Sequence, residues 1–339
     1  MEKIRLGLIG AGKGGRNVGL SQKGLPEIEL AAVSDADTTR AEEAARLFGA
    51  GKYYADYRQL LADKDIDAVF IATPNHLHCE MTVAAARAGK HILCEKPMAL
   101  SLEEADIMIN AARENKVKLM VGFVERFIVS HIAAKQILTS GKIGKPVMIH
   151  AKRAHKPRRD AWVNNPGQSG GVLILAGVHN IDLILWFMET KPLRIYAEMD
   201  SFIHTGGFMD SVCLVMRLEN GVIANMVESY TMPQKMPHGV DRRIEIFGTE
   251  GVLDLDMMKQ PLTTCTNETY WLEDTLTWPV INGEMRGAVR DELREFARCI
   301  LEDREPEANG EAGRISLEVA LAAHTAYEQR RVVEFQVKK

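Results

Sequence analysis

The sequence predicts an α/β protein with an N-terminal doubly wound parallel sheet and a C-terminal α/β domain built on a large, mostly antiparallel open sheet. Residues 1–123 alternate short apolar runs with helical patterns, which is typical of parallel strands covered by helices on both faces. A glycine-rich turn follows the first of these runs. Residues 124–339 instead contain strand-like runs in which apolar and polar residues alternate, as expected when one face of a sheet is covered. We therefore expect two domains, 1–123 and 124–339.

The bulk composition limits the classes of function. A chain of 339 residues fits roughly two domains of about 150 residues. The net charge of −4 gives no basic surface for nucleic acid or an anionic membrane. Five cysteines without CxxC spacing predict reduced thiols, a cytoplasmic location and no zinc or other metal site. We expect no signal peptide and no apolar stretch close to the ~20 residues that span a bilayer.

The N-terminal domain is expected to contain alternating strands and helices. A helix should open at the glycine-rich turn. Ser101 and Glu104 have the spacing of a capping box at the start of the last helix. The expected strands are 4–10, 28–35, 67–73, 91–95 and 118–123, and the other expected helices are 38–48, 56–62, 77–88 and 101–115.

The C-terminal domain is expected to begin with a helix that ends at Gly141 and to continue mainly as strands. Turn signals such as Glu219-Asn220-Gly221 separate these strands. Two late helices should precede a terminal strand. The expected strands are 146–155, 193–202, 210–219, 222–231, 242–249, 251–256 and 332–335, and the late helices are 284–302 and 315–330.

The glycine-rich turn predicts a dinucleotide site. GxGxxG spacing directly after a strand lets the backbone approach a pyrophosphate at a helix N-terminus. Asp35 ends the second strand at the offset expected for an acid that binds the adenosine ribose and repels a 2′-phosphate, which favours NAD over NADP. The alternative is a structural turn and a surface aspartate. The candidate cofactor contacts in the turn are Gly10, Gly12, Lys13, Gly14 and Gly15.

Two further segments follow strands of the parallel sheet. Thr73, Pro74, Asn75 and His78 follow the third strand, at the carboxyl edge where open α/β sheets bind ligands. The alternative for His78 is a structural histidine near a helix start, which is the more common case for a single histidine. Lys96 follows the fourth strand in the stretch Glu95-Lys96-Pro97, and a lysine there either reaches solvent or has a function. We expect all these residues to lie along one edge.

Together these motifs resemble the Gfo/Idh/MocA family of oxidoreductases over essentially the whole chain. The resemblance rests on the glycine turn and Asp35, "TPNHLH" at 73–78, "AGKHILCEKPMAL" at 88–100, "VGFVERF" at 121–127 and "GGVLILAGVHNIDLILW" at 170–186. It implies a Rossmann domain, a nicotinamide cofactor, a sugar or polyol substrate, and a C-terminal sheet that serves as the interface of a homodimer or homotetramer.

The same resemblance implies that Lys96 is the catalytic lysine and that Glu95 lies near the nicotinamide ribose. Oxidation of an alcohol needs a base for the hydroxyl proton, and a lysine with its free pKa of about 10.4 is a poor one. Partial desolvation and the positive charge of the oxidised nicotinamide ring would both lower the lysine pKa.

The second catalytic motif departs from the family pattern. Many members have an aspartate four residues before the site histidine, and here Leu175 stands four residues before His179. Without that acid, His179 lacks a partner that would orient its ring and favour its protonated form. Two mechanisms remain open: Lys96 and His179 share proton transfer, or the substrate supplies its own polar contact. The change could also mark a protein that binds NAD without turnover.

Substrate contacts are expected from two loops. The segment 151–166 contains Arg153 and Trp162, whose cationic and aromatic groups suit a polyhydroxylated ring. The loop 230–241 contains His238 and could act as a lid. An exposed basic loop and an ordinary connection between strands are the respective alternatives.

Three functions are considered. The first is an NAD-dependent dehydrogenase that oxidises a secondary hydroxyl of a cyclic sugar or an inositol-like polyol, with Lys96 and His179 handling the proton. The second is an NAD-dependent lyase or glycosidase that works through transient oxidation of the ring. The third is a non-catalytic regulator that binds NAD and a sugar. The retained Lys96 and His179 favour the first.

Overall fold

The computed structural model describes residues 3–158, 160–204 and 207–336. The chain forms two compact units: Met1–Phe127 with Trp278–Arg314, and Ile128–Thr277 with Ile315–Lys339. The sequence suggested a single boundary after residue 123, whereas the segment Trp278–Arg314 returns to the first unit. The reason is the helix α9 (Ala288–Leu301), which buries Val289, Leu293 and Phe296.

The first unit is a doubly wound parallel sheet, as predicted. The strand order is β3-β2-β1-β4-β5-β6 among the described residues, and all five neighbouring pairs are parallel. The central strands β1 and β4 are almost entirely buried. The strands are β1 (Ile4–Ile9), β2 (Ile28–Ser34), β3 (Lys52–Tyr54), β4 (Ala68–Ile71), β5 (His91–Glu95) and β6 (Leu119–Gly122).

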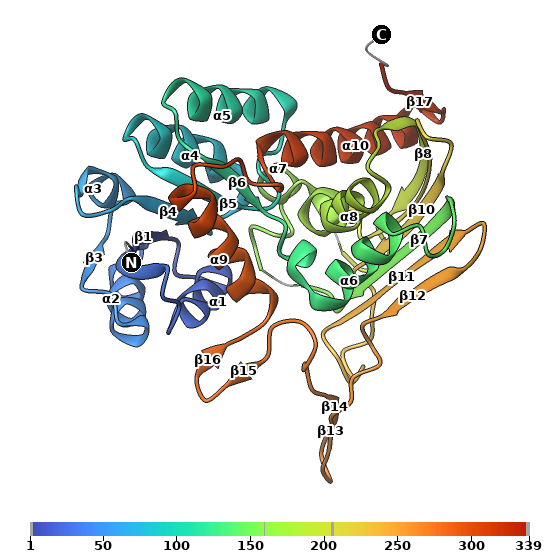
Figure 1. Ribbon diagram of the computed structural model, residues 1–339. Helices are drawn as coiled ribbons and strands as arrows, with labels where there is room; N and C mark the ends of the chain where they lie inside the picture. Colours follow the sequence, from blue (N-terminus) through green and yellow to red (C-terminus); the bar gives the residue numbers. More distant parts are fainter. Residues whose placement is uncertain (1–2, 159, 205–206, 337–339) are drawn as a thin grey trace. The chain divides into compact units, whose positions relative to one another are not determined.

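Helices cover both faces of this sheet. Helices α4 and α5 lie side by side on one face, and α1 and α9 lie on the other (Figure 1). The predicted capping box is present in part: Ser101 Oγ accepts a hydrogen bond from Glu104 N at 3.2 Å, while Glu104 Oε2 accepts from Leu100 N, one residue before the N-cap, at 3.0 Å. The helices that connect the strands are α1 (Lys13–Ser21), α2 (Thr38–Phe48), α3 (Tyr57–Ala62), η1 (Asn75–Leu77), α4 (His78–Arg87), α5 (Leu102–Glu114) and η2 (Val124–Phe127).

The second unit is built on a mixed, mostly antiparallel sheet, which also agrees with the prediction. Its order is β12-β11-β7-β10-β9-β8-β17 within the described residues, and β10 and β7 form a parallel pair. Residues alternate between buried and outward positions along β8 and β9. The strands are β7 (Pro146–His155), β8 (Pro192–Asp200), β9 (Ser211–Leu218), β10 (Ile223–Ser229), β11 (Val240–Gly248), β12 (Val252–Asp256) and β17 (Val333–Glu334).

Helices cover one face of the second sheet. Helix α6 (Val129–Thr139) packs against β12, and α8 (Val178–Met188) packs against β7 (Figure 1). A short helix α7 (Pro166–Ser169) and a π-helix η3 (Leu173–Gly177) precede α8. Helix α10 (Gly310–Gln329) begins five residues before the expected start.

The segment Pro166–Met188 corrects the expectation about long apolar stretches. It spans 23 residues and is long and apolar enough to cross a membrane by composition, but 94% of its most apolar window is buried inside the protein. Its hydrophobicity is therefore accounted for by its position under the second sheet.

Several short elements were not predicted. Strand β3 has three residues, two of them exposed, so it lacks an apolar run. The hairpin of β13 (Thr263–Cys265) with β14 (Tyr270–Leu272) is almost entirely exposed. In the hairpin of β15 (Val280–Ile281) with β16 (Glu284–Met285), β15 is exposed and Met285 is buried. All five cysteines are free thiols. In the described part of the chain, no three His, Cys, Asp or Glu side chains cluster as a metal site would need.

Candidate cofactor and substrate site

The glycine turn between β1 and α1 has the geometry that a diphosphate needs. Gly10 has φ +95°, and a Cβ at this position would lie 2.6 Å from the carbonyl oxygen of Ala72. A Cβ at Gly15 would lie 1.9 Å from the carbonyl oxygen of Gly10. Gly12 is different: it is exposed, and nothing lies within 4 Å of the position its Cβ would take. Gly10 and Gly15 therefore shape the turn, while Gly12 leaves open space beside it.

Asp35 lies beside this turn. Its Oδ2 accepts a hydrogen bond from Ala11 N at 2.8 Å, so the carboxylate is fixed to the glycine segment. Its Oδ1 accepts hydrogen bonds from Asp37 N at 2.9 Å and from Arg40 Nη1 at 3.2 Å. The sequence placed an acid at this point correctly but gave no sign of the ion pair with Arg40, whose side chain is 52% exposed.

The segment Thr73–His78 follows β4 at the same edge. Asn75 is buried, and Thr73 Oγ1 donates to Met81 Sδ at 3.4 Å. The His78 ring is fully buried, with Nδ1 2.8 Å from the Pro97 carbonyl oxygen and Nε2 2.9 Å from the Thr73 carbonyl oxygen. Burial lowers the pKa of His78. This geometry favours a structural role in which His78 joins the ends of β4 and β5.

The segment Glu95-Lys96-Pro97 completes this edge. Lys96 is partly exposed, and its peptide bond to Pro97 is cis. Glu95 Oε2 accepts a hydrogen bond from Lys96 N at 3.2 Å, and Glu95 Oε1 lies 4.0 Å from the position of a Cβ at Gly14. Desolvation raises the pKa of the Glu95 carboxyl, and the positive charge of Lys96 opposes that shift. Glu95 thus faces the glycine turn.

Sequence reasoning missed a second carboxyl group at this edge. Glu292 on α9 is 2% exposed, and burial raises its pKa well above the ordinary value. The negative charge of Glu95 shifts this pKa in the same direction. The signal in the sequence was an acid next to Leu293 on the apolar side of the predicted helix, and helix periodicity could have found it.

His179 belongs to the second unit, at the second position of α8. It is 7% exposed, and Leu175 is buried in the π-helix η3 that precedes it. π-Helical turns occur frequently at functional sites. Asp182 follows His179 by three residues, so the two share one side of α8, and Asp182 is 2% exposed. The HxxD spacing is the signal for this acid, which the sequence reasoning did not use.

Arg153 lies inside the second unit rather than in an exposed loop. Its side chain is 4% exposed and forms an ion pair with the fully buried Glu228, with Nε 3.9 Å from Oε2. His155 lies 3.3 Å from the other oxygen of Glu228 and stacks on Tyr230 at 4.6 Å between ring centroids. Because a buried carboxylate needs such partners, this arrangement favours a structural role for Arg153.

The two other predicted substrate contacts also belong to the second unit. Trp162 is half-buried, and the Arg158 guanidinium lies 5.7 Å from the centre of its ring. His238 is 8% exposed, and burial lowers its pKa. Its loop is tied to the hairpin β13–β14 by a hydrogen bond from Leu272 N to the Pro237 carbonyl oxygen at 2.7 Å.

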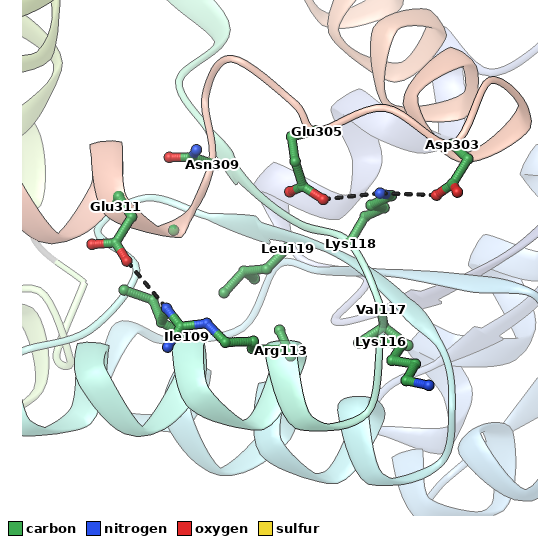
Figure 2. A pocket seen from close by; sticks show the side chains of 12 residues that line it. Ile109, Arg113, Lys116, Val117, Lys118, Leu119, Asp303, Glu305, Asn309 and Glu311 are labelled. Carbon is green, nitrogen blue, oxygen red and sulfur yellow. Dashed lines mark hydrogen bonds and ion pairs between the residues drawn. The ribbon is translucent and has the colours of Figure 1, made fainter.

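A pocket of about 430 Å³ lies at a different place in the first unit. It is lined by the end of α5, the amino end of β6 and the chain around residues 303–311 (Figure 2). Most of its charged groups are paired, since Lys118 contacts Asp303 at 3.0 Å and Glu305 at 2.9 Å, and Arg113 contacts Glu311 at 3.6 Å. Ligands of such sheets bind at the carboxyl edge, so this pocket is not the cofactor site.

The structure therefore brings the cofactor motifs together at one edge of the parallel sheet. The glycine turn follows β1, Asp35 follows β2, Thr73 follows β4 and Glu95 ends β5. All these strands are parallel, so their carboxyl ends meet. A carboxylate fixed to an exposed glycine turn fits the ribose and diphosphate of a dinucleotide.

Comparisons with known proteins match both the first and the second sheet-forming part of the chain. Residues 4–123 match the model described as "Oxidoreductase family, NAD-binding Rossmann fold", and residues 131–254 match the GFO/IDH/MocA C-terminal domain. Myo-inositol 2-dehydrogenase of Thermotoga maritima is 27% identical over 98% of this chain and 99% of its own length. The 1,5-anhydro-D-fructose reductase of Ensifer adhaerens is 31% identical over 98% of both chains.

A solved structure gives the same result for the fold. The putative myo-inositol dehydrogenase of Sinorhizobium meliloti superposes with a TM-score of 0.86 at 27% identity, over 98% of this chain and 100% of that one. The motifs, the two folds and these matches agree over nearly the full length. The chain therefore belongs to the GFO/IDH/MocA family of oxidoreductases with an NAD-binding Rossmann fold.

Proposed function

We propose that the protein is an NAD-dependent oxidoreductase that oxidises a secondary hydroxyl of a cyclic sugar or an inositol-like polyol. The observation that carries the proposal is the segment Glu95-Lys96 at the carboxyl end of β5, where Glu95 lies beside Gly14 of the dinucleotide turn. The names of the inositol dehydrogenases among its relatives support a polyol as the substrate.

The bound nicotinamide would supply the hydride acceptor. In the proposal, Lys96 removes the proton from the reacting hydroxyl, which is why it needs its neutral amine form. His179 is assigned a hydrogen bond or a share of this proton transfer. In the absence of an acid at position 175, the proposal assigns the orientation of the His179 ring to Asp182, a buried acid one turn along α8. Trp162 and His238 remain candidates for contacts with the sugar ring.

NAD is proposed as the preferred cofactor over NADP. The Asp35 carboxylate is fixed by Ala11 N beside the turn, where it accepts hydrogen bonds from ribose hydroxyls and repels a 2′-phosphate. Arg40 is the group that could moderate this preference, because its exposed guanidinium lies 3.2 Å from Asp35.

We further propose a cytoplasmic homodimer or homotetramer formed through the second sheet. The free thiols agree with a reducing compartment. The sheet face opposite α6 and α8 carries exposed apolar side chains on adjacent strands, namely Tyr196, Val215 and Ile223, which are 37%, 49% and 38% exposed. Tyr196 pairs with Val215, and Ile223 lies on the neighbouring strand β10, so this face carries apolar side chains of the kind that a second copy buries.

The proposal is tested by following NADH formation at 340 nm with a panel of inositols, aldoses and anhydro sugars. Turnover with at least one cyclic polyol, and faster turnover with NAD than with NADP, is expected. Chromogenic glycosides are included, because release of phenol without accumulation of NADH would indicate the glycosidase reaction instead. Tight binding of NAD and sugar with no turnover across the panel would contradict an enzymatic function.

A further inference from the structure

Glu292 differs from the other acids of α9. Asp291 forms an ion pair with Arg294, and Glu295 forms one with Arg304. The Glu292 side chain is 2% exposed, and its Oε1 has no hydrogen-bond partner among the described residues. Burial of an ionised carboxylate without a positive partner costs free energy of folding. We therefore expect Glu292 to be a neutral acid in the folded protein or to have a function.

One neighbouring charged group shifts the pKa of Glu292, and it lies outside α9. Helix α9 packs against α1, β2 and η2. The Glu95 carboxyl is the group whose charge raises the pKa of Glu292. Arg126 of η2 donates instead to the Glu307 carbonyl oxygen at 3.1 Å. The titratable and charged groups on the elements that pack against α9 are Lys13, Arg16, Glu29, Glu125 and Arg126.

Glu95 connects this buried acid to the cofactor edge. Its Oε1 lies 4.0 Å from the position of a Cβ at Gly14, so it faces the turn that receives the diphosphate. Gly122 on β6 permits this position, because a Cβ there would lie 3.2 Å from the Glu95 Cα atom. Two ionised carboxylates next to a dinucleotide would repel each other and its diphosphate.

We propose that Glu292 belongs to the cofactor site as a positioning residue whose carboxyl group stays protonated while the dinucleotide is bound. Of the two carboxyl groups Glu95 and Glu292, the neutral Glu292 leaves only Glu95 negatively charged. Glu292 acts through Glu95 and takes no part in the hydride or proton transfer of catalysis. This inference rests on the proposed function only in that the chain must bind a nicotinamide dinucleotide.

Proton retention links cofactor affinity to pH. As pH rises, free protein loses the Glu292 proton, and the new charge beside Glu95 opposes the incoming anion. Binding of the dinucleotide then requires Glu292 to take up a proton. The dissociation constant of the dinucleotide therefore increases by up to about tenfold per pH unit above the Glu292 pKa. The dissociation constant of NADH should rise more steeply with pH than that of NAD, because the neutral ring of NADH gives no compensating positive charge.

The test is NADH binding to the full chain, followed by nicotinamide fluorescence from pH 6 to pH 9.5. The wild type should bind more weakly as pH rises, and Glu292→Gln should bind with an affinity that stays nearly constant. Asp291→Asn is the matched control, since it also converts a carboxyl on α9 to an amide, and it should follow the wild type. Glu95 and Lys96 are present in all three proteins, so the difference between them isolates Glu292.

An unchanged rise of the dissociation constant in Glu292→Gln would overturn the inference. If that variant does not fold, calorimetry of the wild type at alkaline pH in buffers of different ionisation enthalpy decides the question. Uptake of a proton on NADH binding supports the inference, and binding without proton uptake overturns it. Failure of the wild type to bind NADH even at pH 6 would instead contradict the proposed function itself.

Discussion

Single residues at the cofactor edge are held by contacts with the backbone. Asp35 is fixed by Ala11 N at 2.8 Å, and His78 bridges the carbonyl oxygens of Thr73 and Pro97. Glu95 accepts from Lys96 N. These contacts hold the carboxylates of Asp35 and Glu95 in place before any ligand arrives, so these two groups need little ordering on binding.

Glu292 gives a prediction about stability at this scale. Its pKa in the folded protein is raised well above 4.5 by burial. Between that ordinary value and the raised one, the folded protein keeps a proton that the unfolded chain has lost, so stability falls as pH rises by up to about 1.4 kcal/mol per pH unit. Urea unfolding at pH 5 and pH 8 should show a steeper loss of stability in the wild type than in Glu292→Gln. Equal losses in the two proteins would show that Glu292 does not retain its proton on folding.

The sequence locates Asp35 directly, but for Glu292 it indicates only a place on the apolar side of a helix and not a position close to Glu95. Asp35 lies at a fixed offset from a glycine motif, so local spacing locates it. Glu292 is separated from Glu95 by most of the chain, and acids on helices are usually exposed. Arg153 shows the opposite case: its loop looked exposed, but pairing with Glu228 across β7 and β10 buries it.

At the scale of elements, a substitution in the glycine turn is expected to change cofactor binding without changing the stability of the fold. Gly12→Ala should leave thermal stability unchanged, because nothing lies within 4 Å of the new Cβ. The methyl group would occupy the space through which a diphosphate approaches, so affinity for NAD should fall by about tenfold or more. Gly51→Ala is the control, since its Cβ also meets nothing within 4 Å but lies outside the turn. Equal affinities of the two variants for NAD would show that the dinucleotide does not bind at this turn.

The predicted boundaries of helices and strands agree with the structure where the local sequence pattern is strong. The spans of β5 and β7 agree with prediction because both combine apolar residues with clear ends. Strand β3 was not predicted because two of its three residues are exposed and give no apolar run. Its pairing with β2 makes it a strand, and this pairing leaves no local signal in the sequence. The π-helix η3 has no local signature in an apolar run such as Leu173–Gly177.

For the whole molecule, the order of elements along the chain conceals the division into units. The sheet of the first unit ends at β6, yet its packing is completed by α9, which follows every strand of the second sheet except β17 in sequence. A long-range return of this kind leaves no change in composition at the boundary. The assignment of α9 to the first unit is evident only from the packing of its apolar side on α1 and η2.

The oligomer proposal gives a prediction at this scale. Val215→Glu places a charge in the middle of the outward face of the second sheet, and it should shift the protein toward monomer in analytical ultracentrifugation. Val129→Glu is the matched control, because Val129 is 69% exposed on α6 in the same unit. The control should keep the wild-type state. A wild-type distribution for Val215→Glu would exclude this face as the interface.

The central claim is that Lys96 removes the hydroxyl proton in a hydride transfer to NAD. It is tested most directly by single-turnover formation of NADH with the best polyol of the panel, in the wild type and in Lys96→Met, after NAD binding by the variant has been verified. Loss of the base should slow NADH formation by about 10²–10⁴-fold while binding of NAD is retained. A rate equal to that of the wild type would contradict the account.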